Sequence, residues 1–245
     1  MELLNLDKLD PRAQRIVAPY CQKIWEIHGE NLKALFIYGS ATGKDFIPGK
    51  SNINLLAIFQ KIDLSDLKKS LKLVAQGRKR GIIAPLMLTM EHIRHSTDAF
   101  PIEFLEMKEN HLLLYGEELL LDLEINPQNI RIECEEQIKG GLIRLYETYL
   151  EIGMKEKQVR MLLINSLVCL IPVMRNLLRL KGESVPVEKK VIINNLTQLF
   201  SLNKETFLNV WEMKQGKKPI DLERLFGNYL EEIEKLGIAV DRLEL

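Results

Sequence analysis

The sequence has little cysteine and no excess of charge of either sign. Its three cysteines, Cys21, Cys134 and Cys169, are far apart and form neither a Cys-x-x-Cys pair nor a Cys/His ligand spacing. A structural zinc site or a secreted disulfide framework is therefore not predicted, and a reduced cytoplasmic protein with packed thiols is the simplest interpretation. Basic and acidic residues each number 34. This balance excludes a strong overall attraction to nucleic acid or to an anionic membrane.

Long apolar runs are also scarce. Residues 1–10 lack the basic region followed by an apolar core that marks a signal peptide. The longest apolar stretch, 161–173, is short and is interrupted by Asn165, Ser166 and Pro172. Because a bilayer span needs about 20 apolar residues, we expect this stretch to be a central helix of a bundle, and we expect no membrane partner.

The remaining composition is that of a globular protein whose pattern changes near its middle. Of its 245 residues, 46% are apolar and 28% are charged, which is enough for a packed core. Short strand-like runs give way to long helical patterns around Asn126-Pro127. We therefore predict the α+β class: a mixed sheet with flanking helices in a domain over 1–125, followed by an all-α helical bundle over 126–245.

In the first half, Asp10-Pro11 predicts the start of an amphipathic helix. Strands are predicted at 35–38, 55–59 and 82–89, and a further strand over 102–107. A helix over 64–80 is expected to begin at Asp63. Its apolar positions Leu64, Leu67, Leu71 and Val74 are expected to face inward.

In the second half, helical patterns cover 130–152, 155–180, 187–200, 204–213 and 222–236. Gly140-Gly141, inside the first of them, predicts close contact between helices or a kink. A bundle of this kind offers a surface for a homodimer through the helical domain.

The candidate functional site is expected where the end of the first strand meets the start of the second. Gly39-Ser40 directly follows the first strand, and such a turn lets exposed N–H groups bind the oxygens of a phosphate. Eleven residues separate Ser40 from Asn52-Ile53-Asn54, at the second strand. Because side chains alternate along a strand, Asn52 and Asn54 are expected to share one face.

This layout resembles the nucleotidyltransferase superfamily, in particular its two-domain bacterial type with a C-terminal helical domain. In that superfamily a hydrophobic strand ends in Gly-Ser, and the next strand carries two carboxylates one residue apart that hold Mg²⁺ with a nucleoside triphosphate. The resemblance implies nucleotide binding by Gly39, Ser40 and Lys44, and it makes Asn52 and Asn54 the metal positions. It further implies that Glu103 is a third carboxylate, acting as a metal ligand or general base. An exposed edge-strand glutamate is an equally good interpretation of Glu103.

Asparagine at both metal positions removes two negative charges from the place where Mg²⁺ would bind, because Mg²⁺ prefers anionic oxygen ligands. Asp45 could supply one carboxylate, but from a different direction. Three hypotheses therefore stay open. The first is a catalytically impaired member that binds a nucleotide or a partner in a cleft between its domains. The second is an active Mg²⁺-dependent enzyme that transfers a nucleoside monophosphate to an unknown small-molecule or protein acceptor. The third is a purely structural interaction protein.

Overall fold

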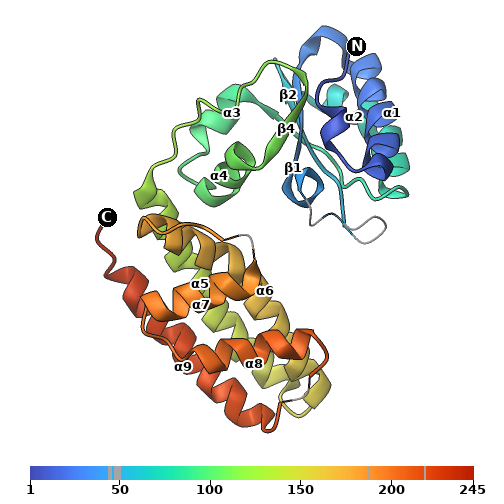
Figure 1. Ribbon diagram of the computed structural model, residues 1–245. Coiled ribbons are helices and arrows are strands. Elements are labelled where there is room, and N and C mark those ends of the chain that lie inside the picture. Colours follow the sequence, from blue (N-terminus) through green and yellow to red (C-terminus); the bar gives the residue numbers. More distant parts are fainter. Residues whose placement is uncertain (44–45, 47–50, 187, 218) are drawn as a thin grey trace. The chain divides into compact units, whose positions relative to one another are not determined.

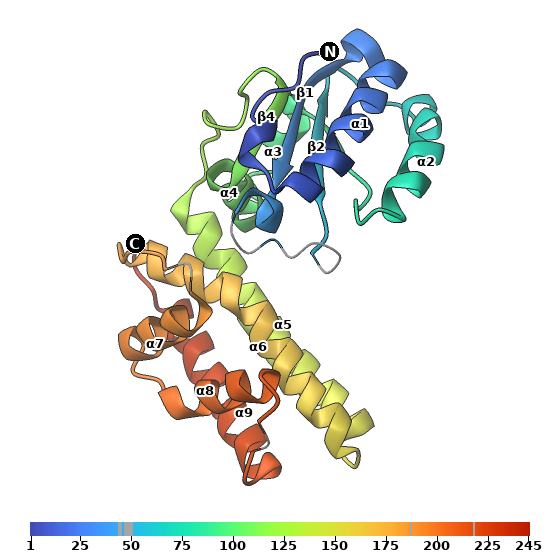
Figure 2. The same cartoon turned by 45° about the vertical axis from the view of Figure 1, so that its right-hand side comes forward.

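The computed structural model describes residues 1–43, 46, 51–186, 188–217 and 219–245, and for Ser40 only the backbone. Figures 1 and 2 show the chain coloured along the sequence. It divides into two compact units, Met1–Ile125 and Asn126–Leu245. The first unit holds a mixed sheet with flanking helices and the second is a bundle of helices, so the predicted α+β class is confirmed.

The sheet of the first unit has the strand order β3-β2-β1-β4. Its strands are β1 (Leu32–Tyr38), β2 (Asn54–Phe59), β3 (Leu86–Thr89) and β4 (His111–Gly116). β1 runs antiparallel to both β2 and β4, whereas β2 and β3 are parallel. Tyr38 pairs with Asn54, so the end of β1 meets the start of β2.

Alternation along β1 builds a core on each face of the sheet. Leu35 and Ile37 belong to a buried cluster that includes residues of α1 (Pro11–His28) and of α2 (Leu64–Arg78). Ala34 and Phe36 belong to a second cluster, with residues of α3 (Met90–His95) and α4 (Pro101–Glu109). Both views show α1 and α2 on one face and α3 and α4 on the other (Figures 1 and 2). Because both faces are covered, β1 and β2 read as continuous apolar runs.

The strand predicted over 102–107 is wrong, because these residues form part of α4. Pro101 stands in the first turn of the helix, where its missing N–H costs nothing. Ile102, Phe104 and Met107 are buried, and the last two are one helical turn apart. A short apolar run fits both the helical and the strand period. The edge of the sheet is instead formed by β4.

The inward face predicted for α2 is also wrong. Leu64, Leu67 and Leu71 are 65%, 43% and 63% exposed. The buried residues of this helix are Asp66, Ser70, Leu73 and Gly77. A Cβ at Gly77 would lie 2.6 Å from Cε2 of Tyr20, so the helix approaches α1 at the position where it has no side chain. This close approach, and not the leucine spacing, decides which face is buried.

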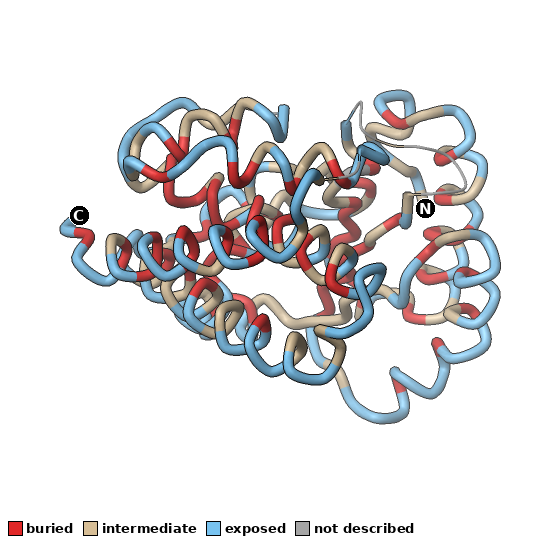
Figure 3. Tube along the Cα trace, turned by 90° about the horizontal axis from the view of Figure 1, so that it is seen from below, coloured by how far each residue is buried: buried red, intermediate tan, exposed pale blue. Residues whose placement is uncertain are grey.

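The second unit consists of α5 (Pro127–Ile152), α6 (Glu156–Leu180), α7 (Lys189–Leu199), α8 (Lys204–Lys214) and α9 (Leu222–Asp241). α6 contacts each of the other four helices. Buried and exposed residues alternate along these helices, as expected when one side of each packs inward (Figure 3). Tyr229 of α9 is fully buried at the centre of this packing. Short 3-10 helices occur in the first unit at Leu6–Lys8, Gly29–Asn31 and Gly39–Thr42.

Among the described residues, α6 alone is long and apolar enough to cross a membrane by length and composition. From the sequence we expected the apolar stretch 161–173 to be too short to span a bilayer, but the helix that contains it is 25 residues long. However, half of its most apolar window is buried inside the structure. A core helix has this burial, and a single such helix is weak evidence for a membrane protein. The position expected for it, at the centre of the bundle, agrees with its contacts.

The two faces of α2 give a first prediction. Leu73 is 6% exposed and Leu71 is 63% exposed. Leu73→Ala should lower the free energy of unfolding by about 2–4 kcal/mol, because it leaves a cavity in the core. Leu71→Ala, the matched control, should change it by less than about 0.5 kcal/mol. Urea denaturation of both variants measures the difference. Equal losses would mean that the leucine face of α2 is the one buried in solution.

Candidate functional site

The turn at the end of β1 begins with glycine in a backbone conformation that suits no other residue well. Gly39 has φ +76° and starts the 3-10 helix Gly39–Thr42. Its N–H donates to the carbonyl of Asn110 over 3.2 Å, and its carbonyl accepts from Oγ1 of Thr42 over 2.8 Å. Gly39 is therefore fixed by backbone and side-chain hydrogen bonds. Because its own N–H is used inside the fold, N–H groups later in the turn would have to bind a phosphate.

Gly39 also lies against the second strand. A Cβ at this position would be 3.1 Å from Nδ2 of Asn54, which is tighter than ordinary contact. The pairing of Tyr38 with Asn54 explains this closeness, because the turn starts one residue after the pair. The structure thus brings together two residues that have fourteen others between them in the sequence, and a side chain in place of Gly39 would crowd the Asn54 amide.

Ile53 anchors the segment Asn52-Ile53-Asn54 through its burial and its backbone hydrogen bonds. It is 1% exposed, its N–H donates to the carbonyl of Gly81 over 2.9 Å, and its carbonyl accepts from the N–H of Ile83 over 3.1 Å. Asn52 is exposed and Asn54 is half-buried. That both side chains point away from the face that Ile53 occupies stays a prediction from the alternation of a strand. Asn52 lies just before β2, and Asn54 is its first residue.

The other predicted site residues are not gathered there. Glu103 is exposed in the first turn of α4, so it is not the strand carboxylate that we expected. Lys44 and Asp45 lie outside the described residues, as does the side chain of Ser40. None of the four strands contains aspartate or glutamate. In the described part of the chain, no three His, Cys, Asp or Glu residues form a group that could hold a metal ion.

One contact that the sequence did not reveal lies beside the turn. His111 starts β4 and pairs with Tyr38. Its Nδ1 is 2.8 Å from the carbonyl of Met107, and its Nε2 is 3.0 Å from Oε1 of Glu118. Both partners offer acceptor oxygens to the ring. These bonds fix the start of β4 next to Asn110, which accepts from Gly39. The sequence offered only a histidine before an apolar run as a signal.

A second polar cluster lies between α1 and α2 and superficially has the composition of a hydrolase triad. Nε2 of His28 is 2.8 Å from Oγ of Ser70, but Nδ1 of His28 is 3.9 Å from Oδ1 of Asp66, which is too long for a hydrogen bond. The Ser70 hydroxyl donates to the carbonyl of Asp66. The adjoining cavity has a volume of only about 10 Å³. The cluster has no room for a substrate, so we assign it to packing of the helices.

Burial sets the protonation of this cluster. Desolvation lowers the pKa of His28, an effect that Asp66 opposes and Lys69 reinforces. The imidazole therefore stays neutral down to a lower pH than an exposed histidine would. Burial raises the pKa of Asp66. The hydrogen bonds from the Asp63 N–H and from Lys69 lower it by more than burial raises it, so the net pKa is below its usual value.

Comparison with known proteins places the fold but not the activity. No family model matches the chain, and no curated protein matches it. A solved structure that is similar is that of the spectinomycin adenyltransferase AAD(9) from Enterococcus faecialis with ATP and spectinomycin. The TM-score is 0.56 at 14% sequence identity, and the match covers 92% of this chain and 98% of that one. The chain therefore has a nucleotidyltransferase-like fold, in agreement with the resemblance seen in its sequence.

The buried histidine gives a second prediction. Because the pKa of His28 is lowered in the folded state, the unfolded chain takes up this proton first as the pH falls below about 6.5. Stability should therefore rise with pH through this range and fall on acidification, by at most about 1.4 kcal/mol per pH unit for one proton. Denaturant unfolding at pH 5.5 and 7.5 measures this.

The variant His28→Gln keeps a donor for Ser70 and should reduce the loss of stability on acidification. The exposed His95 provides the control, because His95→Gln should leave the pH dependence as it is in the wild type. If both variants lost stability equally on acidification, desolvation of His28 would not contribute to it.

Proposed function

We propose that this protein binds a nucleotide at the Gly39 turn and that nucleotidyl transfer in it is lost or strongly impaired. The observation that carries the proposal is the contact between Gly39, at φ +76°, and Asn54. A turn in which a side chain would be strained and would crowd the Asn54 amide lies against the strand position where the superfamily carries a metal-binding carboxylate. Here that position is a neutral amide.

Nucleotide binding is supported by the turn and by the fold. The similar adenyltransferase was solved with ATP. In this chain the backbone after Gly39 turns through a 3-10 helix directly at the end of a strand, an arrangement in which successive N–H groups can face an anion. The turn that Gly39 opens, with the backbone N–H of Ser40 as its first free donor position, is thus our proposed phosphate site, and Lys44 is a proposed contributor.

Mg²⁺ does not fit the residues that the structure describes at this place. Asn52 and Asn54 offer neutral carbonyl oxygens, whereas Mg²⁺ needs anionic ligands to replace part of its hydration shell. Glu103, exposed on α4, does not extend the strand pair as a third carboxylate. We therefore derive no metal-dependent step for this chain. What its residues can do is orient and bind a phosphate group.

Two other functions remain as alternatives. An active transferase would need carboxylates from elsewhere, and its acceptor, a small molecule or a protein, would define its biology. A purely structural protein would bind no nucleotide. Melting temperatures with nucleoside triphosphates, with and without Mg²⁺, separate the three, because a ligand that binds only the folded state raises apparent stability. Stabilisation without pyrophosphate release supports our proposal. A cytoplasmic location and a homodimer through the helical unit stay predictions.

The third prediction concerns the turn. Gly39→Val places a branched side chain at a positive φ and within contact of Asn54, so it should weaken nucleotide binding at least tenfold. Gly43→Val is the matched control, because a Cβ at the exposed Gly43 would meet nothing within 4 Å. Lys44→Ala should weaken binding less than Gly39→Val does. Titrations followed by melting temperature give the affinities, and equal affinity in wild type and Gly39→Val would assign the turn a structural role only.

The fourth prediction concerns the missing charges. Asn52→Asp with Asn54→Asp places two carboxylates on one side of a strand, about 6.5 Å apart along the backbone. Without metal the two acids should repel each other and raise at least one pKa. With Mg²⁺ and a nucleoside triphosphate, the double variant should gain a metal-dependent rise in melting temperature that the wild type lacks.

The control for this variant is Asn165→Asp with Asn228→Asp, which adds the same two charges at exposed helical positions of the second unit. It should gain no metal dependence. Pyrophosphate release is measured alongside, and metal binding should return more readily than turnover. If the wild type already releases pyrophosphate with Mg²⁺ at about 1 per second or faster, which is typical of enzymes, the active-enzyme alternative is correct.

A further inference from the structure

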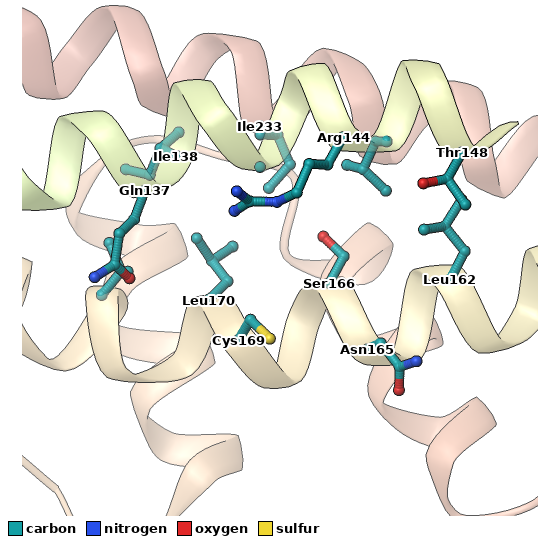
Figure 4. A pocket seen from close by; sticks show the side chains of 13 residues that line it. Gln137, Ile138, Arg144, Thr148, Leu162, Asn165, Ser166, Cys169, Leu170 and Ile233 are labelled. Atoms are coloured by element: carbon teal, nitrogen blue, oxygen red, sulfur yellow. The ribbon is translucent and has the colours of Figure 1, made fainter. Parts of the chain in front are cut away.

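We propose that a groove in the helical unit binds a small organic anion with an apolar body, such as a medium-chain carboxylate. The groove has a volume of about 240 Å³ and runs between α5 and α6, with Ile233 of α9 contributing to its floor (Figure 4). This volume is slightly below the range of about 300–1,000 Å³ typical of small-molecule sites. The ligand should therefore be small. This site is independent of the nucleotide site proposed at Gly39.

The charge in the groove favours an anion. Among the described lining residues, Arg144 alone is charged, and none is acidic. Its side chain reaches from α5 along the groove (Figure 4). Other arginines of these helices form ion pairs one turn away: Arg131 with Glu135 at 2.8 Å, and Arg160 with Glu156. Arg144 is offered no such partner by the residues that the structure describes. A guanidinium can bind a carboxylate through two parallel hydrogen bonds.

The rest of the lining suits a molecule with an apolar part. Ile138, Leu145, Leu170 and Ile233 provide aliphatic surface. Thr148 and Asn165 lie at the same end of the groove as Leu162 and add polar groups (Figure 4). Small-molecule sites commonly combine an apolar lining with a few polar groups that orient the ligand.

A glycine within α5 keeps this groove open. Gly141 lines it, and a Cβ at Gly141 would meet nothing within 4 Å. The close helix contact predicted from Gly140-Gly141 is therefore not the reason for glycine here. Glycine inside a helix is unfavourable relative to alanine because it loses more backbone freedom on folding. The position thus lowers the stability of α5 and leaves free the space that a methyl group would occupy.

Cys169 makes occupancy of the groove measurable. It is exposed and lines the groove, whereas Cys21 and Cys134 are buried. Burial raises the pKa of both buried thiols to about 12, so they should react slowly with N-ethylmaleimide. Octanoate is the probe, and the rate of Cys169 alkylation in the intact protein is the readout. Acetate, which lacks the tail, and octylamine, which has the opposite charge, are the controls.

Octanoate should slow alkylation of Cys169 several-fold at millimolar concentration, and acetate and octylamine should not. Gly141→Ala should raise the half-protecting concentration about tenfold or more, because its methyl group enters the groove. Arg144→Gln should do the same by removing the charge. Gly140→Ala is the matched control: it gives α5 the same gain in helix propensity, Gly140 does not line the groove, and its Cβ would make only an ordinary contact, at 3.8 Å, with Nη1 of Arg144. Its protection should equal that of the wild type.

Both alanine variants should melt about 2–4 °C higher than the wild type, which checks that they fold. The proposal would be overturned if octanoate gave no protection of Cys169, if octylamine protected Cys169 equally well, or if octanoate protected Gly141→Ala as well as it protects the wild type. Protection that persists in Arg144→Gln would also overturn it, since the groove would then bind apolar tails without regard to charge.

Discussion

The candidate site depends on the antiparallel pairing of β1 with β2. Because Tyr38 is opposite Asn54, the residue that follows β1 must turn directly beside the first residue of β2. Gly39 makes this turn at a positive φ, and a side chain there would press on the Asn54 amide. A shift of one residue in this register would exchange the two faces of the strand. It would then bury Asn54 and expose Ile53, so the apolar core of the sheet itself holds the site in place.

The sequence predicted most of this arrangement because its signals are local. Turn residues bound the strands, caps and apolar periodicity mark the helices, and alternation places Asn52 and Asn54 on one face. Two predictions failed where tertiary contacts decided. The run 102–107 fits either period, and it became a helix because Pro101 starts one and β4 occupies the sheet edge. The face of α2 was misassigned because a buried hydrogen bond between His28 and Ser70, and the lack of a side chain at Gly77, do not show in a hydrophobic pattern.

Asparagine at positions 52 and 54 is compatible with an intact fold for an electrostatic reason. Two aspartates this close stabilise a site only when a cation binds between them, and without it they repel each other. Asparagine has nearly the same shape and no charge, so it removes the repulsion and leaves the packing of Ile53 unchanged. Functional sites commonly lower stability, and a chain that gives up the reaction can give up this cost. Gly39, at its positive φ, makes the turn beside Asn54 without backbone strain.

Positions where local preference and structure disagree are the ones most informative about function. In this chain they include Gly141, a glycine inside a helix with no packing reason, and the exposed leucines of α2. The two cases differ in what can be inferred. The groove at Gly141 has a volume, a single charged residue, aliphatic surface and polar groups along its length, so it specifies a class of ligand. The leucine face of α2 has exposure alone and specifies no partner. Chemistry, and not the extent of apolar surface, therefore separates a site that can be proposed from one that can only be described.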